Sequence, residues 1–213
     1  RALGFAVLFC CVSTSPGRAM NQTWVHRWQI SQSSGFLQSP EIASLPPFEG
    51  CTIVTVGRLV PWKGVDKLLQ VVADLPSVRL VVVGDGPLRA DLESQATALH
   101  LGKRALFTGR VAGDWVRAYL RASDVFVLNS TYEGLPHIVL EAMQVGIPVI
   151  ATQTPGTAEL IQHGITGLLV PPGNEEALRA SLEVLLGDPD KRSRLADTAR
   201  QRLEQSFQWE QLV

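Results

Sequence analysis

The sequence contains little cysteine, almost no net charge and no apolar run long enough to cross a membrane. Of the 3 cysteines in 213 residues, Cys10 and Cys11 are adjacent, so we predict neither a disulfide framework nor a cysteine-based metal site. The net charge of −1 gives no global field that would attract nucleic acid or an anionic membrane. The most apolar run, residues 2 to 12, is shorter than the roughly 18 residues that a membrane span requires. We therefore expect a cytoplasmic protein that does not bind nucleic acid.

The chain changes character near residue 50. Residues 1–50 are expected to form an irregular N-terminal segment, because residues 13 to 50 are rich in Ser, Gln, Pro and Gly and show little periodicity. The run at residues 2 to 12 also resembles a signal-peptide core, but the first residue is Arg1, and we interpret the segment as a truncated or misread remnant. We predict that residues 51–213 form the folded domain.

From residue 51 onward, short apolar runs alternate with longer amphipathic stretches. The expected strands are TIVTVG (52–57), VRLVVVG (78–84), ALFTG (105–109), DVFVLN (124–129) and IPVIAT (147–152). Continuous apolar strands that alternate with helices indicate a parallel sheet covered on both faces. The sequence therefore predicts an α/β fold, a doubly wound Rossmann-like sheet, with extra helices after Pro171 that begin at the caps Asn174 and Asp188.

Ligands of doubly wound sheets bind beyond the carboxyl ends of the strands, so the loops there are candidate sites. In VGRLVPWKG, Arg58 and Lys63 lie five positions apart after the first strand. Two such cations suit a diphosphate, with Arg as a planar fork and Lys as a point charge. Solvated loop charges are the simpler alternative.

The GDGP segment after the second strand lacks one glycine of the dinucleotide fingerprint. Arg89 stands where G-x-G-x-x-G requires the third glycine, so a nicotinamide site is disfavoured. Gly84, Gly86 and Pro87 indicate a tight turn, or a loop that forms one wall of a ligand site. No histidine has metal-ligand spacing, and we predict no metal site and no cofactor.

EGLPHIVLEAM carries the strongest signal. Pro136 stands where a helix can begin, and the N–H groups of His137 to Leu140 would then be free to bind phosphate oxygens. Glu133 precedes that helix, where its oxygens can accept hydrogen bonds from a polyol, and Glu141 lies within the first two turns. Dipole stabilisation of about 0.3–1 kcal/mol would also explain Glu141. TQTPGTAELIQHG, with Glu159, is a weaker second wall of the same cleft.

These segments, in this order, resemble the nucleotide-sugar-binding half of family 4 retaining glycosyltransferases of the GT-B fold. The resemblance rests on GRLVPWKGVDKLL, VVVGDGP, FTGRV, ASDVFVLNSTYEGLPHIVLEAM, GIPVIAT and GLLVPPGN, and covers about residues 51 to 213. It implies a hexosyltransferase that moves a sugar from a nucleoside diphosphate to a glycan or lipid-linked acceptor. It also implies that a second, preceding domain binds the acceptor, and that the full enzyme associates peripherally with the inner face of the membrane.

The resemblance also implies a role for each matching residue. Arg58 and Lys63 would neutralise the diphosphate, Glu133 would hold the transferred sugar, and Glu141 would bind the ribose. Backbone groups would contact sugar and phosphate, and further residues would line the base; these donor-binding positions are Gly57, Gly86, Arg110, Val111, Gly134, Leu135, Pro136, His137, Ile138 and Val139. Two alternatives stay open: a nucleotide-sugar-binding fragment without activity, and an epimerase of the same fold.

Overall fold

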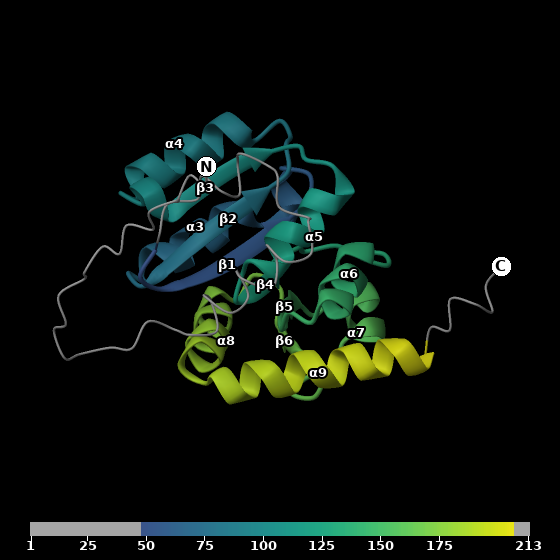
Figure 1. Ribbon diagram of the computed structural model, residues 1–213. Helices are drawn as coiled ribbons and strands as arrows, with labels where there is room; N and C mark the ends of the chain where they lie inside the picture. Colours follow the sequence, from purple (N-terminus) through teal and green to yellow (C-terminus); the bar gives the residue numbers. More distant parts are fainter. Residues whose placement is uncertain (1–47, 207–213) are drawn as a thin grey trace, which may run out of the picture.

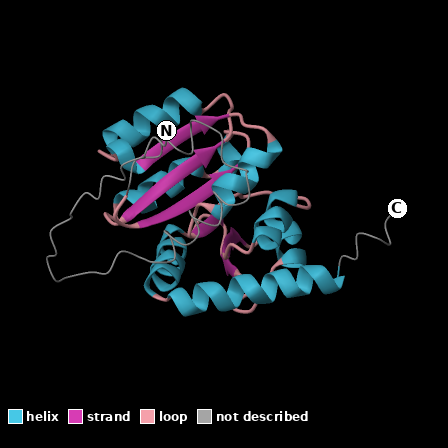
Figure 2. Ribbon diagram, viewed as in Figure 1, coloured by secondary structure: helices cyan, strands magenta, loops and turns pink. Residues whose placement is uncertain are grey.

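Six short strands lie side by side in one parallel sheet (Figures 1 and 2). The structure is a computed structural model that describes residues 48–206, so most of the expected N-terminal segment lies outside the described residues. The spatial order is β3-β2-β1-β4-β5-β6, and each pair of neighbours is parallel. The strands are β1 (Cys51–Val56), β2 (Val78–Val83), β3 (Ala105–Gly109), β4 (Val125–Leu128), β5 (Val149–Thr152) and β6 (Leu168–Val170).

Helices cover both faces of this sheet, which confirms the predicted fold class. One face packs against α3 (Val65–Ala73), α4 (Arg89–Ala98) and α8 (Glu175–Gly187). The other packs against α5 (Gly113–Arg121), α6 (His137–Val145), α7 (Pro155–Leu160) and α9 (Pro189–Ser206). Two short 3-10 helices, η1 (Pro61–Lys63) and η2 (Gly102–Arg104), lie in the connections.

Alternate side chains of each central strand enter opposite layers of the core. In β1, Ile53 belongs to the α3–α4–α8 layer and Val54 to the α5–α6–α7–α9 layer, and both are fully buried. In β4, Val127 belongs to the α3–α4–α8 layer and Phe126 to the α5–α6–α7–α9 layer. A strand that is buried on both faces needs apolar residues at successive positions, which explains why these strands appear in the sequence as continuous apolar runs.

Most element boundaries agree with the sequence-based expectation. The run at 105–109 is β3 to the residue, and the other expected strands differ from the observed ones by one or two residues at an end. The sequence analysis missed β6, which has only three residues and precedes two prolines.

The C-terminal helices begin at the predicted caps. Asn174 Oδ1 accepts a hydrogen bond from the Ala177 N–H at 2.9 Å, and Asp188 Oδ1 accepts one from Lys191 N–H at 2.8 Å. Asp188 therefore stands alone between α8 and α9, and Pro189 and Asp190 are the first residues of α9. Helix α9 contacts α8 and α6, so it crosses the β6 side of the molecule and closes both layers (Figure 1).

The sheet order reverses direction at β1. Strands β2 and β3 follow β1 on one side, whereas β4, β5 and β6 lie on the other. Because β1 and β4 are parallel neighbours, the loops that follow them leave the same edge of the sheet side by side. A doubly wound sheet binds ligands at this switch point.

Candidate functional site

The loops after β1 and β4 are joined by backbone and side-chain hydrogen bonds. Thr131 N–H donates to the Trp62 carbonyl at 2.8 Å, and Asn129 Nδ2 donates to the Gly64 carbonyl at 2.9 Å. On its other side, Asn129 Oδ1 accepts a 3.4 Å hydrogen bond from Thr152 Oγ1 at the end of β5. Asn129, directly after β4, is therefore hydrogen-bonded both to the segment that follows β1 and to the end of β5. The sequence analysis missed this role, although Asn directly after a buried strand is a signal for it.

Gly64 allows the two loops to approach this closely. Its φ is +59°, in the left-handed region where a β-carbon is strained, and it ends η1 and caps α3. A β-carbon here would also overlap the carbonyl oxygen of Asn129. Glycine at this position thus fixes where the residue before it, Lys63, leaves the backbone.

Lys63 and Glu133 meet directly at the centre of the site. Lys63 Nζ lies 2.5 Å from Glu133 Oε1, although the residues are 70 positions apart in the chain. Their side chains are only 20% and 11% exposed. The methylene carbons of Lys63 cross Gly57, where a β-carbon would lie 3.6 Å from Cε. The structure therefore unites two residues that the sequence analysis assigned to different parts of a ligand.

Arg58 lies at the same edge of the sheet as this pair. It follows β1 by two residues and is exposed, and within residues 48–206 its side chain makes no hydrogen bond or ion pair. Beneath the loop, the residues at the ends of β1 and β2 enclose a hollow of about 10 Å³, roughly the space of one water molecule. The guanidinium is thus free to approach a ligand at the switch point.

The start of α6 faces the same edge. Pro136 is the N-cap and His137 the first helical residue, so the helix begins where the sequence predicts. The N–H of Val139 already donates to the Pro136 carbonyl at 2.9 Å, which differs from the expectation that it is free. A helix leaves the N–H groups of its first turn without intrahelical acceptors, so His137 and Ile138 remain to bind an anion.

The loop after β5 packs closely on the Glu133 loop. A β-carbon at Gly156 would overlap the carbonyl oxygen of Gly134, so the two backbones touch. Thr154 and Thr157 form a reciprocal capping box at the start of α7, which fixes the position of Gly156 between them. The contact places the TQTPGTAEL loop beside the Glu133 loop, while Glu159 is exposed on α7, and a role as the second wall of a ligand cleft stays a prediction.

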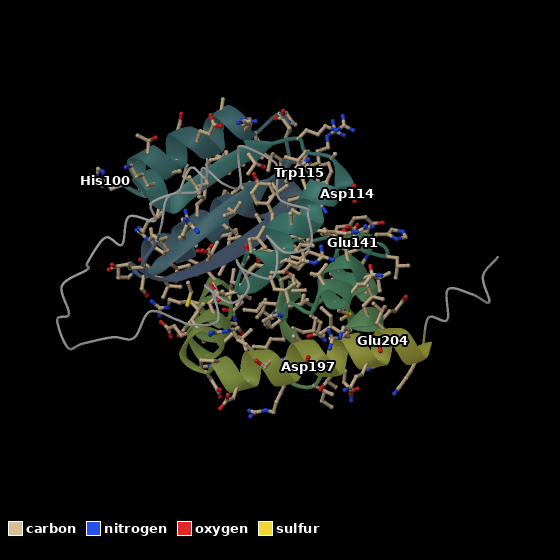
Figure 3. All side chains as sticks on the ribbon, viewed as in Figure 1. His100, Asp114, Trp115, Glu141, Asp197 and Glu204 are labelled. Atoms are coloured by element: carbon tan, nitrogen blue, oxygen red, sulfur yellow. The ribbon has the colours of Figure 1, made fainter. Side chains whose placement is uncertain are left out.

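Glu141 lies on the second turn of α6 and is half-buried. Within residues 48–206, no hydrogen bond or ion pair holds its carboxylate. Figure 3 labels it on α6, together with Asp114 and Trp115 at the start of the neighbouring helix α5. The carboxylate is therefore available to a ligand.

The remaining predicted residues lie farther along the edge, at the exits of β2 and β3. Gly86 follows β2, and its N–H donates to Asp85 Oδ1 at 2.8 Å. Arg110 is exposed, whereas Val111 packs against the α5–α6–α7–α9 layer. In the loop after β4, Leu135 is 47% exposed, two residues after Glu133. The structure thus arranges the predicted residues along one edge from β3 to β5.

Two exposed aromatic side chains and one buried hydroxyl also belong to these loops. Trp62 and Tyr132, each directly before a member of the ion pair, are 49% and 73% exposed. Ser130 is fully buried, and its hydroxyl has no hydrogen-bond partner within residues 48–206. An unpaired buried hydroxyl costs about 1–3 kcal/mol, so stability does not explain its presence. The sequence analysis named none of these three residues.

Two groups with perturbed pKa values, Cys51 and Arg79, lie at the opposite, amino-terminal edge of the sheet. Burial raises the pKa of the Cys51 thiol, and the nearby Asp124 adds to this effect. Burial lowers the pKa of Arg79, against the opposing effect of Asp124. Arg79 donates to Thr52 Oγ1 at 2.9 Å, and its guanidinium lies 5.2 Å from the centre of the Phe48 ring. These groups lie away from the carboxyl ends of the strands, where the candidate site is.

Within residues 48–206, no three His, Cys, Asp or Glu side chains lie together in a way that suits a metal ion. In the same range, no helix has both the length and the apolar character of a membrane span.

The family model for glycosyl transferases group 1 matches residues 44–202. The lipopolysaccharide core biosynthesis glycosyltransferase LpsE of Rhizobium meliloti is 31% identical over 211 residues, in a match that covers 96% of this chain and 62% of LpsE. A GDP-mannose-dependent α-(1-6)-phosphatidylinositol monomannoside mannosyltransferase of Mycobacterium tuberculosis is 34% identical over 176 residues, in a match that covers 76% of this chain and 45% of that protein.

Among solved structures, Anabaena HepE in complex with UDP-glucose superposes with a TM-score of 0.72 and 28% identity. The match covers 91% of this chain and 50% of HepE. The chain therefore spans about half to two thirds of the length of these relatives.

Proposed function

This chain belongs to the glycosyl transferases group 1 family, and from that membership we propose that it binds the donor of a retaining family 4 glycosyltransferase. The donor is a nucleoside diphosphate sugar, and the described domain is the donor-binding half of the enzyme. The relatives support this: HepE was solved with UDP-glucose, and the mycobacterial mannosyltransferase is named as GDP-mannose-dependent.

One observation carries the proposal. A lysine, a glutamate and the start of a helix converge at the point where the sheet order reverses, and the Lys63–Glu133 contact of 2.5 Å joins the loops that bear them. A nucleoside diphosphate sugar needs cations for its phosphates and a hydrogen-bond acceptor for its hydroxyls. Both occur here within one ligand's reach.

The cations act on the leaving group. As the bond between the anomeric carbon and the phosphate oxygen breaks, negative charge grows on the diphosphate and an oxocarbenium ion develops on the sugar. Arg58 and Lys63 stabilise the phosphate charge, at about 1.5–3 kcal/mol for each charge-assisted hydrogen bond. The N–H groups of His137 and Ile138 add the positive end of α6.

The carboxylates hold hydroxyl groups. Glu133 accepts hydrogen bonds from the transferred sugar, and Glu141, half-buried on α6, accepts them from the ribose diol. Arg110 and Val111 line the base, with Gly86 on the neighbouring wall. In this assignment neither glutamate transfers a proton, and the chemistry needs no metal ion.

We expect the ion pair to loosen when the donor binds. With the pair closed, one N–H of Lys63 and one oxygen of Glu133 are bonded to each other and are not available to a phosphate or a sugar. The donor supplies replacements for both: a phosphate for the lysine and hydroxyls for the glutamate. Both charges therefore stay satisfied after the exchange.

The acceptor in this proposal is a glycan or a lipid-linked sugar, bound by a further domain that precedes the donor half. The name of LpsE, which belongs to lipopolysaccharide core biosynthesis, favours such an acceptor. We place the full enzyme on the cytoplasmic side of the membrane, where nucleotide sugars and lipid-linked acceptors meet.

Calorimetric titration of the full chain with UDP, GDP, UDP-glucose and GDP-mannose tests the proposal. We expect Lys63→Ala and Arg58→Ala each to weaken binding of the preferred diphosphate by roughly 10- to 100-fold. Arg194→Ala removes an exposed arginine on α9 and serves as the control, with no change expected. Equal affinity in all four proteins would refute the phosphate roles, and conversion of a donor to an epimeric sugar without acceptor would favour an epimerase.

A further inference from the structure

Arg89 occupies a defined position at the exit of β3. It is the first residue of α4, and a β-carbon added to Gly109, the last residue of β3, would lie 2.7 Å from its Nη1. Gly109 has a φ of +73°, a backbone conformation that favours glycine. The guanidinium therefore lies against the backbone directly before Arg110 and Val111.

Two carboxylates hold this guanidinium in place. Arg89 Nε donates to Glu93 Oε1 at 2.8 Å, and its Nη1 lies 3.9 Å from Asp85 Oδ2. The side chain is still 34% exposed, so a ligand can reach it.

Helix stability does not account for an arginine at this position. A cation at the first helical residue is opposed by the positive end of the helix dipole. The ion pair with Glu93 also has the weaker orientation, because the acidic residue is better placed N-terminal to the basic one. A bound ligand that accepts hydrogen bonds would explain an arginine at this position.

Arg89 shares a continuous wall with the proposed diphosphate site. Leu59 N–H donates to the Asp85 carbonyl at 3.0 Å, and Leu88 N–H donates to the Leu59 carbonyl at 3.2 Å, which fixes the Arg89 loop to the Arg58 loop. The exits of β1 and β3 are two strand spacings apart, about 9.6 Å. A nucleotide whose diphosphate lies at β1 and whose base points toward β3 would cover this distance.

We propose that Arg89 reads the nucleobase of the donor and selects bases with an exocyclic carbonyl over bases with an amino group at the same position. A guanidinium only donates hydrogen bonds. It therefore pairs with O4 of uracil or O6 of guanine, and it opposes the amino groups of cytosine and adenine. This inference rests on the proposed function and names the donor class for that site.

The test compares UDP with CDP, and GDP with ADP. Cytosine has an amino group at position 4 where uracil has a carbonyl, and adenine has one at position 6 where guanine has a carbonyl; guanine also carries an amino group at position 2, so UDP and CDP are the closer match. Calorimetric titrations use the full chain, its Arg89→Gln variant and a control, Arg200→Gln. Arg200 is also an exposed helical arginine in an intrahelical pair, 3.6 Å from Asp197, and lies on α9. Thermal melting confirms that each variant is folded.

For the wild type, we expect the carbonyl base of at least one pair to bind roughly 10- to 100-fold tighter than its amino counterpart. Glutamine offers both a donor and an acceptor, so Arg89→Gln should bring that ratio close to one, whereas Arg200→Gln should preserve it.

The contrary outcomes separate this inference from the proposed function. A wild type without preference, or a preference that survives in Arg89→Gln, overturns the role of Arg89. Equal weakening of both members of a pair in Arg89→Gln also overturns it, and assigns the guanidinium to a phosphate. If Arg58→Ala still weakens binding in any of these cases, the proposed function stands. If the wild type binds no nucleoside diphosphate, both the proposed function and the role of Arg89 are wrong.

Discussion

The contact between Lys63 and Glu133 shows how the position of one side chain depends on several backbone features. Lys63 leaves a 3-10 turn that ends at Gly64, and Glu133 leaves a loop that Asn129 and Thr131 fasten to that turn. Their pairing at 2.5 Å neutralises both charges where the side chains are largely buried. A buried charge without a partner is costly, so the ion pair holds both side chains in place.

Substitution of Glu133 should therefore separate affinity for phosphate from affinity for sugar. Glu133→Gln frees Lys63 from its carboxylate, so UDP or GDP should bind about tenfold tighter, whichever the wild type prefers. The corresponding nucleotide sugar should gain less, because the carboxylate that accepts its hydroxyls has been removed. Calorimetric titration with both ligands measures the ratio of the two dissociation constants.

Glu183→Gln is the matched control for this experiment. Glu183 is exposed on α8, and its replacement should leave both dissociation constants unchanged. If Glu133→Gln shifted the two constants by the same factor, Glu133 would have no role in binding the sugar.

At the scale of the elements, the sequence predicts the long buried strands and the capped helices well. Strands such as VRLVVV carry their own signal, because burial on both faces requires an unbroken apolar run. Strand β6 has no such signal, since three residues are too few to show a period. Its place in the sheet depends on pairing with β5.

The loops of the site were also predictable, but their contacts were not. Sequence motifs indicate Arg58, Lys63, Glu133 and the start of α6 as candidates. Which loops touch depends on the strand order, and the order places β4 beside β1. The Lys63–Glu133 pair and the bridging role of Asn129 follow only from that order. The use of the Val139 N–H within its own turn depends on the cap geometry at Pro136.

The contact between the β4 and β5 loops leads to a prediction about Gly156. Gly156→Ala would drive a methyl group into the Gly134 carbonyl, which is backbone and cannot rotate away. Overpacking of this kind costs about 1–3 kcal/mol of unfolding free energy. The displaced Glu133 loop should also bind donor less tightly. Urea unfolding and donor titration measure the two effects.

Gly187→Ala provides the comparison, because a β-carbon there meets no atom within 4 Å. It should unfold at nearly the wild-type urea concentration. Equal stability of the two alanine variants would show that the loops have room to separate.

At the scale of the whole molecule, two apolar layers on either side of the sheet provide the stability. Leu178, Leu182 and Leu185 of α8 are at most 1% exposed and pack into the same layer as α3 and β2. The ion pair between Lys67 and Glu175 also joins α3 to α8 at 2.6 Å, but its side chains are 42% and 36% exposed. Exposed pairs of this kind contribute little to stability.

A comparison of these two links tests which one holds α8 in place. Leu182→Ala should lower the unfolding free energy by about 2–5 kcal/mol, since it leaves a cavity in a fully packed layer. Lys67→Ala, which breaks the exposed pair, should leave the urea midpoint unchanged. A larger loss in Lys67→Ala than in Leu182→Ala would assign the docking of α8 to electrostatics.

The Lys63–Glu133 ion pair at the switch point also affects which anions this domain binds weakly. Inorganic phosphate is abundant in cells, but its charge repels the Glu133 carboxylate that pairs with Lys63, and it brings no sugar hydroxyls to that carboxylate. A molecule that joins a diphosphate to a polyol compensates both groups in a single event. Inorganic phosphate should therefore compete weakly for this domain. In a phosphate-rich medium, the fraction of domain with bound ligand should depend on the concentration of the molecule that joins a diphosphate to a polyol.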